Sequence, residues 1–204
     1  KKVTPGGTKQ VVAPYLNPVD VAGLKALLNT DCPVISAEWF IYWTSQQAKR
    51  NGSGYYDFLG LKSRADAEKL AGLDRAAAIR LQKELAAIVA QSGVAVNDVR
   101  QIYRYQSLTG GWWVTLDTND PAGKGNALSQ LNGDYVHQAE EIYFVLSNEL
   151  FGFVASDDKG VLQETVPDTI AGDHASTSND RRIHPGISCA RCHKEGLRPI
   201  DDWG

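Results

Sequence analysis

Hydrophobic positions near the start of the chain recur at helical spacing. Asn17 is placed to cap a helix and Pro18 to begin it, and leucines follow at three- and four-residue intervals. Residues 34–43 are rich in aromatic side chains, and their periodicity is compatible with a strand or a helix; we expect a helix from Ala37 onwards. Residues 1–17 contain two prolines and two glycines, which indicates an extended arm.

The longest helical pattern spans residues 63–91. Ser63 is suited to be an N-cap, and leucine and alanine side chains then recur every three or four residues. Gly72 can divide this helix into two, and Gly93 can end it. The sequence therefore predicts a helical N-terminal half.

In the second half the hydrophobic period changes to two, which is typical of half-buried strands. Residues 99–105 and 110–116 alternate in this way and are separated by turn residues. Residues 141–146 and 150–155, with a short polar turn between them, predict a β-hairpin. Residues 167–185 are polar and rich in turn formers, which predicts a surface loop.

Helices followed by hairpin-connected strands predict an α+β fold with an antiparallel sheet and an irregular C-terminal segment over residues 184–204. We expect a single domain, residues 18–204, after the arm at residues 1–17. The length of 204 residues, with 43% hydrophobic and 22% charged, is ordinary for one globular domain.

Charge and hydropathy exclude two classes of partner. The net charge is −3, without the basic excess that binding to nucleic acid or to an anionic membrane surface requires. No uninterrupted stretch of about 18 apolar residues occurs, so no transmembrane segment is predicted.

The chain contains no methionine. Because translation starts at methionine, we expect that Lys1 follows an upstream segment, such as an export signal, that has been removed. The same absence excludes, within these residues, the His/Met pair that ligates iron in many high-potential cytochromes c.

The clearest chemical motif is Cys189-Ala190-Arg191-Cys192-His193. Two cysteines separated by two residues can form thioethers with the two vinyl groups of one haem, and a histidine directly after them can ligate the iron. The sequence therefore predicts one covalently bound haem c, with Cys189 and Cys192 as anchors and His193 as the proximal ligand.

Cys189 and Cys192 could also take part in other kinds of site. A zinc ion could recruit His184 with Cys189, Cys192 and His193, but two adjacent residues do not easily face one tetrahedral ion, and no second CxxC is present. A thioredoxin-like site would open a helix in a βαβ unit. A plain disulfide would leave His193 without a role. Haem attachment is favoured, and Cys32 is expected to be a buried, inert thiol.

The sixth iron position separates an electron carrier from a haem enzyme. Three further histidines are candidates. We rank His137 first, because the strand that it precedes could hold it rigidly over the haem. His174 lies in the polar loop, which could fold over the haem, and His184 lies only five residues before Cys189, close to the point of attachment.

Polar and aromatic residues complete the predicted haem environment. An open iron site would need a polar group able to move protons, for which the candidates are Arg100, Arg104, Glu141 and again His137. Aromatic side chains expected to line the haem pocket are Trp112, Trp113, Tyr143 and Phe144.

The tail 184–193, the hairpin residues 137–144 and the segments 33–40 and 56–61 resemble a group of exported bacterial monohaem cytochromes of planctomycete type. Those proteins end in a Gly-Leu/Ile-Ser-Cys-x-x-Cys-His signature. The likeness covers roughly residues 33–200 and implies haem binding, without a further activity. A C-terminal CxxCH also resembles the cytochromes c-prime, whose distal site is open to small gases, but the helical N-terminal half departs from them.

We therefore expect one-electron transfer to and from a redox partner protein, in an exported respiratory or redox chain. Because haem c is attached outside the energy-transducing membrane, a periplasmic or otherwise exported location is expected. One alternative is a five-coordinate haem enzyme or gas-binding protein acting on peroxide or nitrogen oxides. Another is a haem subunit of a larger, membrane-associated respiratory assembly.

Overall fold

The chain divides into two compact units, residues 1–40 and 41–204. The computed structural model describes residues 54–120, 122, 125–127, 135–176, 179–193 and 196–197, together with Ala22, Gly23 and Ala26. Ala22, Gly23 and Ala26 are helical, as predicted for that stretch. The predictions that lie outside the described residues concern the arm, its boundary at residue 17, the rest of the first helix, the helix from Ala37 and the state of Cys32.

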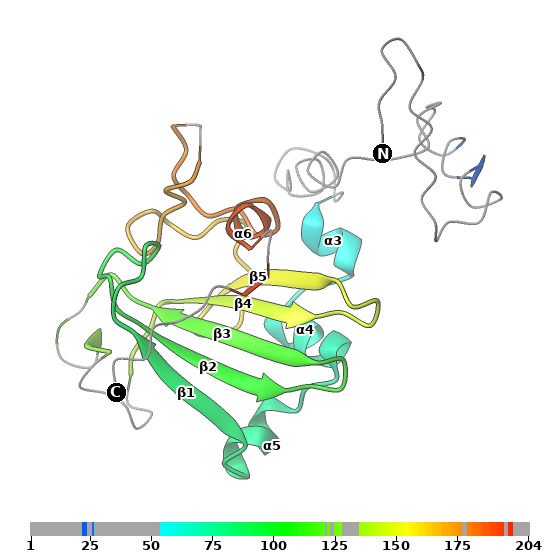
Figure 1. The fold of residues 1–204 in the computed structure, drawn as a ribbon, viewed down its shortest axis with the longest axis horizontal. Helices are drawn as coiled ribbons and strands as arrows, with labels where there is room; N and C mark the ends of the chain where they lie inside the picture. The colour runs from blue at the N-terminus through cyan, green and yellow to red at the C-terminus, as the bar shows by residue number, and fades with distance from the viewer. Residues whose placement is uncertain are drawn as a thin grey trace, which may run out of the picture. The chain divides into compact units, whose positions relative to one another are not determined.

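A five-stranded antiparallel sheet forms the centre of the second unit, in the order β1-β2-β3-β4-β5 (Figure 1). Each strand pairs with the next one along the chain. The strands are β1 Glu84–Val89, β2 Arg100–Gln106, β3 Gly111–Asp117, β4 Ala139–Val145 and β5 Phe151–Asp157. The four predicted strands are confirmed as β2 to β5, and β4 and β5 form the predicted hairpin.

Short helices precede and follow the sheet, which confirms the predicted α+β class. They are α3 Tyr55–Leu59, α4 Arg64–Ala71, α5 Arg75–Arg80 and, after the sheet, α6 Ile187–Cys192. The prediction of an irregular C-terminal segment is therefore wrong for the CxxC residues, which are helical. Among the helices that the structure describes, none is long and apolar enough to cross a membrane.

The signals predicted to begin and divide the long helix act as expected. The Ser63 hydroxyl accepts a hydrogen bond from the backbone N–H of Asp66 (3.2 Å) and so caps α4. Gly72 ends α4 in the left-handed conformation, with φ +66°. A Cβ atom at this position would lie 2.7 Å from Leu108, so both conformation and space require glycine.

The last part of the predicted helix is wrong, because residues 84–89 form strand β1 and not a helix. The chain turns at Gln82, which has φ +53°, and β1 then pairs with β2 from Glu84 opposite Tyr105 onwards. The Tyr105 hydroxyl donates a hydrogen bond to the Glu84 carboxylate (2.8 Å). Helical spacing of hydrophobic residues cannot reveal a partner strand that comes later in the chain, and pairing overrides local propensity. Gly93 accordingly ends no helix.

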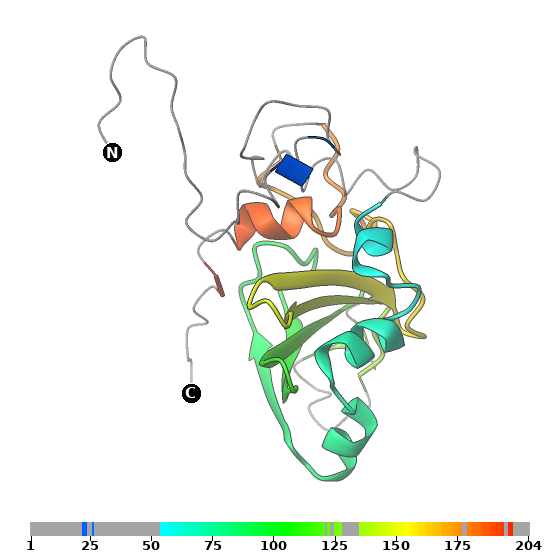
Figure 2. The ribbon, with the colours of Figure 1, turned by 90° about the vertical axis from the view of Figure 1, so that its right-hand side faces the viewer.

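The two faces of the sheet carry different side chains, because alternate residues of a strand point to opposite sides. One face packs on α4 and on Leu73, with Ala67 and Ala71 fully buried. Its core residues are Tyr105, Trp112, Val114, Ile142, Phe144 and Val154. Figure 2 shows α4 and α5 on this side of the sheet and α6 away from them. We call the opposite face, which carries Trp113, Thr115, Glu141, Tyr143 and Phe153, the cavity face.

A second, smaller core closes one end of the cavity face. It joins Ala139 and Ala155 of the sheet to residues of the segment that leads to α6, namely Val166, Ile170, Ala171 and Ile183. Backbone bridges between Val166 and Ile183 and between Ala95 and Ala171 hold this segment in place. The predicted surface loop is thus partly buried, and it positions α6 against the sheet.

Candidate functional site

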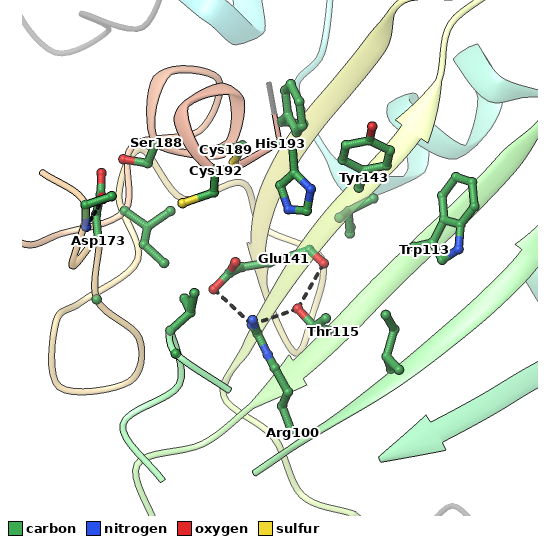
Figure 3. A pocket seen from close by; sticks show the side chains of 18 of the residues that line it. Arg100, Trp113, Thr115, Glu141, Tyr143, Asp173, Ser188, Cys189, Cys192 and His193 are labelled. Atoms are coloured by element: carbon green, nitrogen blue, oxygen red, sulfur yellow. Dashed lines mark hydrogen bonds and ion pairs between the residues drawn. The ribbon is translucent and has the colours of Figure 1, made fainter. Parts of the chain in front are cut away.

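A cavity of about 390 Å³ lies between the cavity face and α6 (Figure 3). The sheet contributes Arg100, Ile102, Trp113, Thr115, Glu141, Tyr143 and Phe153 to its lining. The loops before β2 and before α6 contribute Gly93, Val94 and residues 172–175. This volume falls within the range of about 300–1,000 Å³ that is usual for ligand and cofactor sites.

Helix α6 brings both cysteines of the predicted motif to this cavity. Cys189 and Cys192 are three residues apart in a helix and therefore lie on the same side of it. Both side chains line the cavity, and neither is in a disulfide. Gly186, just before α6, has φ +89°, and a Cβ atom there would lie 3.2 Å from the ring of Tyr55. Glycine thus allows α3 and the start of α6 to approach closely.

His193 follows Cys192 directly and lines the same cavity. Its Nδ1 lies 3.1 Å from the carbonyl oxygen of Gly196. Because a carbonyl oxygen only accepts hydrogen bonds, Nδ1 carries the proton and Nε2 is the basic nitrogen, which is the tautomer that an iron ligand requires. The ring packs against Tyr143 and Phe153, at centroid distances of 5.1 and 6.4 Å.

The surroundings of Cys189 disfavour its thiolate form. Desolvation, with a smaller contribution from the charge of Glu141, raises the pKa of the Cys189 thiol to about 12. Redox-active CxxC motifs instead have a lowered thiol pKa, so this environment disfavours a thioredoxin-like role. Within the described residues, no group of three or more His, Cys, Asp or Glu side chains could hold a metal ion.

A polar cluster occupies the sheet side of the cavity and consists of Arg100, Thr115, Asp117 and Glu141. Arg100 donates through Nε to Asp117 Oδ1 (3.0 Å) and through Nη2 to Asp117 Oδ2 and to Thr115 Oγ1 (2.8 Å for the latter). The same Nη2 lies 3.1 Å from Glu141 Oε1. Figure 3 shows the Glu141 carboxylate between Arg100 and α6.

The sequence predicts Arg100 and Glu141 as candidate polar residues of the site but does not point to Thr115 and Asp117. The register of the sheet places Thr115 opposite Glu141 on the neighbouring strand, and this pairing is what gathers the cluster. The sequence signal for these two residues is that polar side chains occupy alternate positions of the predicted strand. Such side chains must face either solvent or a polar site.

The three candidate sixth ligands lie in different places. His174 lines the cavity. His137 is not among the lining residues, and its Nε2 pairs with Glu140 on the opposite face of the sheet (3.3 Å). His184 is also outside the lining, with its Nε2 3.1 Å from Asp180.

The predicted aromatic residues divide between the two faces. Trp113 and Tyr143 line the cavity, whereas Trp112 and Phe144 pack on each other in the core of the opposite face, 5.0 Å apart. Arg104 is not a lining residue and lies over the ring of Trp113, 5.7 Å from its centroid.

The cavity fits a large, mainly apolar cofactor with polar edges. It combines two thiols and a basic imidazole with aromatic side chains. It also holds the buried hydroxyl oxygen of Tyr143, which makes no hydrogen bond to any described residue, and Glu141 Oε1, which has an ion-pair contact with Arg100 Nη2 at 3.1 Å. Buried polar atoms usually have a hydrogen-bond partner, so Tyr143 Oη is available to a bound group.

Comparisons of the chain with protein-family models, with curated proteins and with solved structures found no match.

Proposed function

We propose that this protein is a c-type cytochrome that holds one haem c in the cavity and transfers single electrons. The observation that carries the proposal is the convergence of Cys189, Cys192 and His193 on one cavity, opposite an aromatic sheet face. When bound, the haem supplies a one-electron Fe(III)/Fe(II) couple.

The chain's own residues would have distinct roles. Cys189 and Cys192 hold the haem through thioether bonds, and His193 Nε2 is the proximal ligand. The Gly196 carbonyl fixes the tautomer of His193 through Nδ1. Trp113, Tyr143 and Phe153 exclude water from the sheet side.

Among the candidate sixth ligands, the geometry favours His174. It is the one of the three that lines the cavity, whereas His137 and His184 pair with carboxylates elsewhere. A His/His pair would give the low-to-mid-potential, six-coordinate haem of an electron carrier. An electron carrier of this kind would exchange electrons with a redox protein in the periplasm or another exported compartment.

A second candidate function is supported by the polar cluster. Glu141 could exchange a proton with a small molecule and Arg100 could donate a hydrogen bond to it, as required of a five-coordinate haem enzyme or gas-binding protein. In that case the iron would keep an open position.

Covalent haem attachment tests the main proposal. The chain is produced in a host that ligates haem c and is then denatured, so that only covalently held haem stays with the polypeptide. We expect one haem per chain, lost in the Cys189→Ala/Cys192→Ala variant and kept in the Cys32→Ala control. A wild-type chain without haem absorbance would refute the proposal.

Carbon monoxide distinguishes the two candidate functions. We expect the reduced wild-type protein to give a sharp low-spin spectrum that carbon monoxide leaves unchanged, and the His174→Ala variant to become high-spin and to bind carbon monoxide. His137→Ala is the matched control, with unchanged coordination. Immediate binding of carbon monoxide by the wild type would favour the enzyme or gas-binding function.

A further inference from the structure

Glu141 is the carboxyl group of the cavity whose charge the protein leaves unmatched. Arg100, the cation of the polar cluster, bonds Asp117 through both Nε and Nη2 and gives a further hydrogen bond to Thr115. Among the described residues, the Glu141 carboxylate has only the ion-pair contact of Oε1 with Nη2, at 3.1 Å. Asp117 is therefore the neutralised carboxylate of the pair.

The charges of the cluster do not sum to zero when both acids are ionised. One guanidinium faces two carboxyl groups, so the cluster is negative by one unit until one carboxyl takes up a proton. Asp117 accepts hydrogen bonds from both Nε and Nη2 of Arg100, whereas Glu141 has an ion-pair contact with Nη2 of the same guanidinium. The proton therefore belongs on Glu141.

The surroundings of Glu141 also favour its neutral form. Its Oε1 atom is buried and makes no hydrogen bond of good geometry to any described residue. Desolvation raises the pKa of Glu141, Arg100 lowers it and the neighbouring Asp117 raises it again, so that the net shift is upward.

We propose that Glu141 is a proton-binding site coupled to the redox state of the cavity: it takes up one proton when the bound haem is reduced and releases it on oxidation. This inference rests on the proposed function. The electron comes from the redox partner protein and the proton from water. The carboxylate becomes a carboxylic acid, and no other bond forms or breaks.

The physical reason is electrostatic. An added electron makes the cavity more negative by one unit, and in a poorly solvated site this disfavours a neighbouring carboxylate. By the same coupling, an ionised Glu141 disfavours reduction and lowers the midpoint potential of the haem. The midpoint potential should therefore fall as pH rises.

The other polar groups that line the cavity near Glu141 have roles or partners of their own. On α6, Cys189 and Cys192 no longer titrate once they are thioethers, and His193 is the proximal ligand. In the loop, the carboxylate of Asp173 is paired with Arg191. His174, also in the loop, lines the cavity and is the proposed sixth iron ligand.

Redox titration of the haem-loaded protein between about pH 5 and pH 9 tests the inference. We expect the wild-type midpoint potential to fall by up to about 59 mV for each tenfold decrease in proton activity. In Glu141→Gln the slope should flatten, and the potential at alkaline pH should lie above that of the wild type. Glu149→Gln, in the exposed turn between β4 and β5, is the matched control and should keep the slope.

The wild type alone gives a second readout, which does not depend on the folding of any variant. Redox-difference infrared spectra should show a protonated-carboxyl C=O band that appears on reduction. A haem-loaded wild type with a flat potential and no such band, or a Glu141→Gln variant that keeps the full slope, would overturn the inference while leaving the haem proposal intact. A chain that carries no haem would instead refute the proposed function, and the inference with it.

Discussion

At the scale of single residues, two buried tyrosine hydroxyls have opposite surroundings. Tyr56 Oη donates to the carbonyl oxygen of Gln163 (2.9 Å) and accepts from the backbone N–H of Ala155 (2.9 Å). Tyr143 Oη is buried without a hydrogen-bond partner among the described residues, and burial raises the pKa of Tyr143 to about 12. The first hydroxyl is part of the fold, and the second faces the cavity.

Removing these two hydroxyls should have different consequences. Tyr56→Phe leaves the N–H of Ala155 and the carbonyl of Gln163 without this partner, and should lower the free energy of unfolding by about 1–3 kcal/mol. Tyr143→Phe removes an unsatisfied group and should change it by less than about 1 kcal/mol. Urea denaturation of both variants measures the difference. Equal losses would show that Tyr143 is hydrogen-bonded in the folded protein.

The residues of the site differ in how far sequence could identify them. Cys189, Cys192 and His193 lie within five consecutive residues, and the proposed haem attachment depends only on that local spacing. Asp117 and Thr115 join Arg100 and Glu141 only through the pairing of three strands, which is long-range information. His174 could not be ranked above His137 without knowing which face of the sheet each one lies on.

At the scale of elements, the Glu140 carboxylate forms ion pairs with residues of α4 and α5 and so attaches both helices to the sheet. Arg64 Nη1 lies 2.6 Å from Glu140 Oε2 and Arg75 Nη1 lies 3.3 Å from Oε1, while the Ser156 hydroxyl donates to Oε2 (3.0 Å). His137 adds a contact at 3.3 Å. Burial raises the pKa of Glu140, but the bond from His137 and the charges of Arg75 and Arg64 outweigh it and lower the pKa to about 2.

This attachment should fail in acid. Because the folded pKa of Glu140 is below its unfolded value of 4.5, protons bind the unfolded chain first as pH falls. The contribution, about 3 kcal/mol, is fully present above about pH 4.5 and is lost as pH falls towards about 2. Urea unfolding at neutral and acid pH should show a weaker acid dependence for Glu140→Gln than for the wild type.

The control for this experiment is Asp158→Asn, a change at an exposed turn carboxylate. It should keep the wild-type dependence of stability on pH. If Glu140→Gln and wild type lost the same free energy between neutral and acid pH, the cluster would not be the acid-sensitive attachment of the helices.

Elements were predicted correctly where local pattern and tertiary pairing agree. Ser63 and Gly72 act within one or two turns of helix, so their effect is visible in sequence. Strand β1 is the exception, because its Leu85 and Ile88 fit a helical period and only the neighbouring strand makes it extended. The short α6 is likewise held by its contacts, including Gly186 against Tyr55.

At the scale of the whole molecule, the sheet separates a packed core from a binding cavity. Most of the main core lies on the face covered by α4, and Tyr143 and Phe153 extend it to the cavity face. On the cavity face, α6 and the loop at residues 172–175 enclose a space that a cofactor would fill. Folding of the sheet and ordering of the site should therefore be separable.

The haem-free Cys189→Ala/Cys192→Ala variant should show this separation. We expect amide-exchange protection to persist in β2, β3 and β4 and to fall in α6 and the loop before it, because under the proposed function these elements lose the haem that would join them to the sheet. The haem-loaded wild type is the reference. Uniform loss of protection in the variant would mean that the sheet depends on the haem.

The sequence by itself determined the CxxCH motif, the α+β order of elements and the signals that cap and divide the helices. Each of these depends on spacing along a few consecutive residues. Only the tertiary structure decided which residues share the cavity, because strand register and the packing of α6 join positions far apart in sequence. It placed Trp113 and Tyr143 in the cavity and their neighbours Trp112 and Phe144 in the core. Adjacent residues of a strand point to opposite faces, so sequence proximity alone could not assign them.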